Sequence, residues 1–210
     1  MDWLAISFYW WLILFFSGLL FYPLTRKIFS NFFDWAYPFS KVIAIITLSY
    51  SIYVLGTLRI LPFSKFSLFF IIFMFLILNI LLLKKTKDKK ISLLQTFLLI
   101  FEEFLFLTAF LFWVFIRSQE PSIRSLEKFM DFGFINSILR GRYFPSLDMW
   151  YSADDLKPEG YPINYYYFGH LSAAMLIKLS GVKPAIGYNL VLSTIFALGI
   201  TLVFSLVFNL

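Results

Sequence analysis

The sequence ISLLQTFLLIFEEFLFLTAFLFWVFI, residues 91–116, decides the class of this protein. A helix needs about 20 mostly apolar residues to cross the hydrocarbon core of a membrane, and this run is longer than that. Its charged side chains are Glu102 and Glu103. A carboxylate inside a span costs a few kcal/mol unless it faces protein or a water-filled cavity. We therefore expect two buried acids, either neutral or paired with a lysine or arginine.

Five further apolar runs accompany this one, at residues 3–22, 42–58, 66–83, 163–179 and 186–210. We expect Pro23 to end the first of them, because proline interrupts a helix. The chain is 60% hydrophobic and 14% charged, and its mean hydropathy is +0.82. A soluble domain has far more charge. The sequence therefore predicts an all-α, polytopic membrane protein with about six transmembrane helices.

Basic residues between the runs predict how the chain crosses the cell membrane. Residues 84–90, KKTKDKK, are the most basic segment, and basic loops stay in the cytoplasm. Alternation then places the long loop, residues 117–162, outside. The predicted domains are four helices in residues 1–116, this external loop, and two helices in residues 163–210. The net charge of +6 reflects these loops and does not indicate nucleic-acid binding. The absence of cysteine excludes disulfides and thiolate metal sites.

The first part of the long loop, residues 122–140, has helical periodicity. Leu126, Met130, Phe134 and Ile138 recur every four residues and share one stripe. This pattern predicts an amphipathic helix on the membrane surface, ended by Gly141. A proline-rich stretch and a tyrosine triplet follow.

Each polar residue of this region has a plain interpretation beside a functional one. Asp131 is either a solvated charge or a functional carboxylate, and His170 is either an interior histidine or part of a site. Asp154 and Asp155 are most simply a solvated turn, and Tyr165 to Tyr167 an aromatic belt at the membrane interface. The tryptophans are most simply belt or packing residues: Trp3, Trp10, Trp11 and Trp113. Oxygen atoms of Asp131, Asp148 and a phosphate would suit Mg²⁺ or Mn²⁺, although no diagnostic spacing requires a metal.

Several segments resemble a known membrane family. They are YPLTRKIF (22–29), LPF (61–63), EKFMDFGFINSILRGRYFP (127–145), LDMW (147–150), INYYYFGHLSAAMLIKLSGV (163–182) and YNL (188–190). This set resembles the Chlor_Arch_YYY family of archaeal and chloroflexal membrane proteins, a domain of unknown function named for its tyrosine triplet. The family tends to have Asp-Pro-Trp where this chain has Asp148-Met149-Trp150, and residues 152–162 form a longer insert. Its members are longer, which implies that this chain is an N-terminal portion.

The loop layout is also similar to that of GT-C membrane glycosyltransferases, which use sugars linked to polyprenyl phosphate. That resemblance implies that Asp131 is the catalytic aspartate, with residues 132–140 as the juxtamembrane helix and Tyr143-Phe144-Pro145 as the step after it. Where such enzymes often have a second acid, this chain has Phe132. The implied substrate-binding residues are Lys128, Arg140, Arg142, Asp148, Tyr165, Tyr166, Tyr167 and His170. The likeness is one of layout, hence an analogy.

Three functions follow as hypotheses. The first is a GT-C-like glycosyltransferase acting at the external face on a polyprenyl-phosphate-linked sugar. The second is a transporter or flippase for a lipid-linked or polar substrate, in which Glu102, Glu103, His170 and Lys178 line a path. The third is a non-catalytic assembly subunit that pairs with a separate C-terminal membrane subunit. The lipid bilayer is the expected partner in all three.

Overall fold

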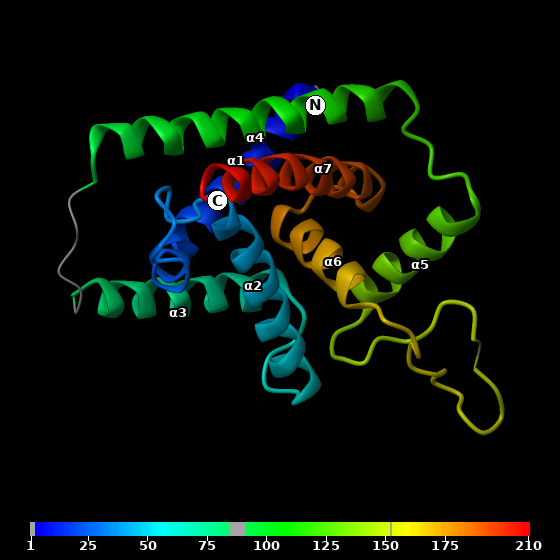
Figure 1. Cartoon of the computed structure of the whole chain (residues 1–210). Coiled ribbons are helices and arrows are strands. Elements are labelled where there is room, and N and C mark those ends of the chain that lie inside the picture. The colour runs from blue at the N-terminus through cyan, green and yellow to red at the C-terminus, as the bar shows by residue number, and fades with distance from the viewer. Residues whose placement is uncertain (1–2, 85–90, 152) are drawn as a thin grey trace. The chain divides into compact units, whose positions relative to one another are not determined.

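The structure, a computed structural model, describes residues 3–84, 91–151 and 153–210 (Figure 1). Over these residues it is all-helical, and its only strand-like pairing is an isolated bridge between Leu147 and Pro162. The predicted all-α class is therefore confirmed. The helices are α1 (Trp3–Ile28), α2 (Phe39–Thr57), α3 (Lys65–Lys84), α4 (Leu93–Gln119), α5 (Leu126–Arg140), α6 (Phe168–Ser180) and α7 (Pro184–Phe208).

Four helices in the described part of the chain are long and apolar enough to cross a membrane, namely α1, α2, α4 and α7. The expected six spans are not supported. The predicted span at residues 163–179 is the 13-residue helix α6, which rises roughly 20 Å where a hydrocarbon core is about 30 Å thick. Helix α3 contributes a shorter apolar stretch, Lys65–Leu81.

The prediction that Pro23 ends the first helix is wrong, because α1 continues to Ile28 with Pro23 inside it. A proline removes one backbone hydrogen bond, but spanning helices tolerate this loss when neighbouring side chains satisfy the freed groups. Just beyond the proline, the buried Thr25 hydroxyl donates to the Phe21 carbonyl oxygen at 2.9 Å.

Helix α5 corresponds to the predicted amphipathic helix, although it begins at Leu126 rather than at residue 122. Ser125 before it has an extended backbone. Phe134 and Ile138 of the predicted stripe are buried. The predicted end at Gly141 is confirmed, because the Gly141 N–H donates to the carbonyl oxygens of Ser137 and Ile138, both at 3.1 Å.

The described chain divides into two compact units. Unit 1 comprises Met1–Ile45, Phe73–Pro121 and Asn189–Leu210, and unit 2 comprises Ile46–Ile72 and Ser122–Tyr188. The predicted domain boundaries at residues 116 and 162 divide the chain into consecutive ranges, whereas each unit combines segments that are separate in sequence. Those boundaries stay a prediction. Residues 85–90 of the predicted cytoplasmic loop lie outside the described residues.

In unit 1, α4 and α7 pack antiparallel (Figure 1). An Arg117 Nη2–H donates to the Asn189 side-chain oxygen at 2.6 Å. The Trp113 and Phe196 rings stack at 4.3 Å, and Phe101 and Phe204 lie 5.3 Å apart. Residue numbers thus fall along α7 as they rise along α4.

Helix α1 joins this pair through two consecutive tryptophans. The Trp10 indole N–H donates to the Thr194 hydroxyl of α7 at 3.0 Å, and the Trp11 indole N–H donates to Glu103 of α4 at 2.7 Å. Of the two interpretations given to these tryptophans, packing therefore describes them better than a lipid-facing belt.

In unit 2, Phe144 anchors the long loop. Its ring lies 5.7 Å from Tyr53 of α2 and 5.4 Å from Phe63. A Cβ atom at Gly56 would come within 2.6 Å of the same ring, so the close approach requires glycine there. The loop is then closed on itself, because the Ile163 N–H donates to the Ser146 carbonyl oxygen at 2.9 Å.

Candidate functional site

Asp131 of α5 and His170 of α6 meet inside unit 2. The Asp131 Oδ1 and His170 Nε2 atoms are 2.9 Å apart. The Asp131 side chain is 35% exposed and that of His170 is 16% exposed. The other imidazole nitrogen, Nδ1, is buried and has no hydrogen-bond partner among the described residues. One carboxylate oxygen is thus fixed by the histidine while the side chain keeps access to solvent.

Aromatic rings surround this pair. The Phe134 ring meets the His170 ring edge-on at 5.3 Å and stacks on Tyr165 at 5.5 Å. Tyr165 in turn stacks on Tyr166 at 3.9 Å, and Trp150 lies 6.3 Å from Phe134. These five side chains, Phe134, Trp150, Tyr165, Tyr166 and His170, form what we call the aromatic platform. All of them except Phe134 and His170 are exposed.

The tyrosine triplet divides between two roles. The Tyr165 hydroxyl donates to the Tyr166 hydroxyl oxygen at 2.5 Å, and this bond raises the pKa of Tyr165. Tyr166 is 80% exposed. Tyr167 lies instead 6.4 Å from Tyr53, and burial raises its pKa to about 12. The first two tyrosines thus belong to the platform, and the third belongs to the packing between α2 and the start of α6.

The predicted basic residues do not all reach this pair. Lys128 lies three positions before Asp131 on α5, where helix neighbours share a face. Arg140 is exposed at the far end of α5, about 13 Å along the helix axis from Asp131. Arg142 is also exposed, with its guanidinium 5.6 Å from the Tyr143 ring. Lys128 is therefore the cation best placed near Asp131.

Asp148 is engaged by its own loop. Its Oδ1 accepts from the backbone N–H groups of Trp150 and Tyr151 at 2.8 and 3.0 Å. Within residues 3–84, 91–151 and 153–210, no three acidic or histidine side chains gather as metal ligands. Mg²⁺ can nevertheless bind through one or two carboxylates and substrate phosphates, so the suggestion of Mg²⁺ or Mn²⁺ stays a prediction.

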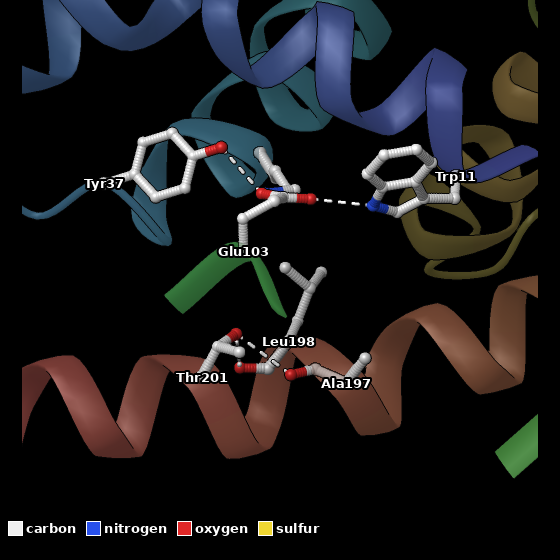
Figure 2. Close-up of polar contacts among 7 residues, drawn as sticks. Trp11, Tyr37, Glu103, Ala197, Leu198 and Thr201 are labelled. Atoms are coloured by element: carbon white, nitrogen blue, oxygen red, sulfur yellow. Dashed lines mark hydrogen bonds and ion pairs between the residues drawn. The ribbon is translucent and has the colours of Figure 1, made fainter. Parts of the chain in front are cut away.

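A second polar cluster, in unit 1, surrounds Glu103. The Tyr37 hydroxyl donates to Oε2 at 2.6 Å and the Trp11 indole donates to Oε1 at 2.7 Å, from opposite sides of the carboxylate (Figure 2). Lys41 forms an ion pair with Oε2 and is 2% exposed. In the same view, the Thr201 hydroxyl of α7 donates to the Ala197 carbonyl oxygen of its own helix at 2.9 Å.

The neighbouring Glu102 has a different environment. It is 1% exposed, and neither oxygen accepts a hydrogen bond from the described residues. Adjacent acids on one helix therefore have opposite surroundings, since Glu103 has three donors and Glu102 has none.

A family model described as "Uncharacterized membrane protein (DUF2298)" matches residues 47–210, well over half of the chain. The chain belongs to this family. It is accordingly a multi-pass membrane protein in contact with the lipid bilayer. No curated protein and no solved structure matches it. The finer Chlor_Arch_YYY and GT-C resemblances, and the side of the membrane that each loop faces, stay predictions.

The DUF2298 match covers all of unit 2 except Ile46, together with the acids of α4, but it begins after Trp11, Tyr37 and Lys41. Sequence reasoning missed the partnership of these three residues with Glu103. Lys41 lies just before the apolar run predicted at residues 42–58, and the structure buries it in the first turn of α2. No spacing could reveal the pair, because Lys41 and Glu103 are distant in sequence and meet only through tertiary packing.

Proposed function

We propose that this DUF2298 protein is a membrane glycosyltransferase that takes a sugar from polyprenyl phosphate and uses Asp131 as general base. The observation that carries the proposal is the contact between Asp131 and His170, 2.9 Å long, made by a carboxylate that stays one-third exposed. A general base must combine a fixed orientation with access to the proton that it removes.

The reaction needs one proton acceptor and one leaving group. The oxygen of an acceptor hydroxyl attacks the anomeric carbon, and the bond between that carbon and the phosphate oxygen breaks. The phosphate leaves with the bonding electron pair, and the hydroxyl proton moves to the free Oδ2 of Asp131. Lys128, one turn before Asp131, is the cation proposed to stabilise the departing phosphate.

His170 is proposed as a positioning residue. Its Nδ1 is buried without a partner among the described residues, and a charged N–H there would lack an acceptor, which is costly. We therefore assign the neutral tautomer whose Nε2–H donates to Asp131 Oδ1. This bond holds Oδ1 and turns Oδ2 toward substrate.

The aromatic platform is proposed as the sugar-binding surface. Tyr166 and Trp150 are 80% and 62% exposed, and flat aromatic side chains of this kind suit the C–H face of a sugar ring. Phe134 links these rings to His170, which brings the platform to the same place as the proposed base.

The test is the substitution Asp131→Asn, with Asp155→Asn, an exposed loop acid, as its matched control. Membranes containing each variant are supplied with polyprenyl-phosphate glucose or polyprenyl-phosphate mannose, and released polyprenyl phosphate is measured. We expect Asp131→Asn to lower the rate by roughly 10²–10⁴-fold, the contribution typical of a general base. Asp155→Asn should leave it unchanged. Transfer by Asp131→Asn at the normal rate would show that Asp131 is not the base.

A further inference from the structure

Glu102 is a buried acid to which no described residue donates a hydrogen bond. It lies within α4, is 1% exposed, and as a carboxylate it would accept no hydrogen bond from the described residues. Burying an ionised carboxylate in this way is strongly unfavourable, and such groups take up a proton instead. The Glu103 carboxylate next to it avoids this penalty through Lys41, Trp11 and Tyr37.

Asp34, whose side chain lies next to that of Glu102, has the opposite arrangement. It is fully buried and accepts three hydrogen bonds: from the Ala36 N–H at 2.9 Å, the Ser205 hydroxyl at 2.5 Å and the Asn209 amide at 2.9 Å. Three donors suit the ionised form. The pair thus consists of a carboxylate rich in donors beside a carboxyl that lacks them.

Two carboxyl groups can form a hydrogen bond only when one of them carries a proton, since both ionised forms are acceptors. As an acid, Glu102 would itself be the donor and Asp34 the acceptor. This assignment gives Glu102 the partner that it lacks as a carboxylate, and it removes the repulsion between two like charges.

The charges around the pair favour the same state. The titratable and charged groups that face it from each packed element are Tyr22 and Arg26 on α1, Tyr37 before α2, Lys41 on α2 and Glu103 on α4. Lys41 is already balanced by Glu103, and the Arg26 guanidinium lies 3.7 Å above the Trp35 ring, next to Asp34. Three ionised acids would therefore face two cations, and one proton makes the cluster neutral.

We propose that Glu102 and Asp34 form a binding site for a single proton within unit 1, with the proton on Glu102 and donated to Asp34. The ligand is the proton itself. The site shares no residue with the proposed glycosyl transfer at Asp131, so either proposal can fail without the other.

The surroundings offer this proton a way in. The Tyr22 hydroxyl is a second buried oxygen without a partner among the described residues, and its ring lies 6.4 Å from that of Trp35, the residue after Asp34. Tyr22 also lines a groove of about 340 Å³ between α1 and α4. A hydroxyl can accept and donate at once, so Tyr22 is suited to pass a proton between the groove and the pair.

The test is infrared spectroscopy of the purified full chain, which detects the carbonyl stretch of a protonated carboxylic acid. At neutral pH we expect this band in the native protein, shifted when the glutamates are labelled with heavy carbon and unshifted when the aspartates are labelled. Glu102→Gln should abolish the band, whereas Glu127→Gln, a change of an exposed acid on α5, should preserve it.

Absence of a glutamate-labelled band at neutral pH, or its persistence in folded Glu102→Gln, would overturn the proposal. Because labelling distinguishes glutamate from aspartate in the native protein, the first outcome can be decided even if Glu102→Gln fails to fold.

Discussion

The two units hold their acids in opposite ways. In unit 1, Glu103 is 13% exposed and receives donors on both oxygens from Lys41, Trp11 and Tyr37. In unit 2, Asp131 is 35% exposed and has His170 as its one partner among the described residues. Glu103 is mostly buried and three of its about four lone-pair sites are filled, whereas Asp131 keeps access to solvent and has fewer donors. The comparison separates an acid that holds helices together from an acid available for chemistry.

Removing Lys41 should have the largest effect on stability. Lys41→Met leaves a buried carboxylate without its cation, a change that costs about 3–5 kcal/mol. Unfolding of the chain in detergent micelles, followed by heat or denaturant, measures the loss. Lys27→Met, at an exposed lysine of α1, should change stability by less than about 0.5 kcal/mol.

The double substitution Lys41→Met with Glu103→Gln should recover most of that loss, because it removes the unpaired charge while the glutamine side-chain oxygen can still accept a hydrogen bond from Trp11 or Tyr37. A single Lys41→Met variant as stable as the native chain would break the proposed contrast between the units.

The two neighbouring tryptophans give the next largest effect. Trp11→Phe removes a donor to a charged acceptor, a bond worth about 1.5–3 kcal/mol. Trp10→Phe removes the same indole but breaks a bond to the neutral Thr194, worth about 0.5–1.5 kcal/mol. Thr194 stays satisfied because its hydroxyl donates to the Leu190 carbonyl oxygen. The unfolding free energies of the two variants are measured in the same detergent. Equal losses of stability would argue that Glu103 is not ionised.

Asp131→Asn should change the free energy of unfolding by about 1 kcal/mol or less, because the asparagine side-chain oxygen can still accept the His170 Nε2–H. The same preparation used for the transfer assay can be unfolded to check this. A large loss of stability would place Asp131 with Glu103 as a structural acid, and would weaken its assignment as a base.

The smallest effect concerns the exposed loop acid Asp154. The Tyr161 hydroxyl donates to its Oδ2 at 2.7 Å, and this bond lowers the pKa of Asp154. The bond is therefore fully present above the ordinary pKa of an aspartate and is lost as the pH falls through the lowered value. We expect Tyr161→Phe to open the loop at higher pH than in the native chain. Hydrogen exchange at the Lys157 N–H, which donates to Asp154 Oδ1 at 2.8 Å, measures this at matched pH.

Local patterns predicted the helices well and their roles less well. The four-residue stripe through Phe134 and Ile138, and Gly141 at its end, placed α5 nearly correctly, because amphipathic periodicity is a local property. The same local reasoning failed at Pro23, because α1 continues through it and spanning helices tolerate a proline more readily than the general rule implies. It also predicted a transmembrane span at residues 163–179. The apolar residues there instead form α6, a largely buried helix that is too short to cross a membrane.

The site was predictable only in part, for a comparable reason. Asp131 and His170 were singled out separately, and the structure brings them together. Phe134, predicted only as part of the apolar stripe of the amphipathic helix, proves to link the histidine to the tyrosines. The partners of Glu103 gave no sequence signal, because they come from three segments that meet only when the helices pack.

The backbone next to Asp34 bears on the order in which the protein can be made. Trp35 and Ala36 both have a left-handed φ of 52°, a conformation that costs roughly 1–2 kcal/mol for each residue with a side chain. The bonds of Asp34 to Ser205 and Asn209 hold this turn from the far end of α7. Because the ribosome synthesises N-terminal segments first, the turn lacks these hydrogen bonds until the last turn of α7 has been synthesised and has entered the bilayer. The turn after Asp34 is therefore synthesised early, but its stabilising hydrogen bonds form only after Ser205 and Asn209 have been synthesised.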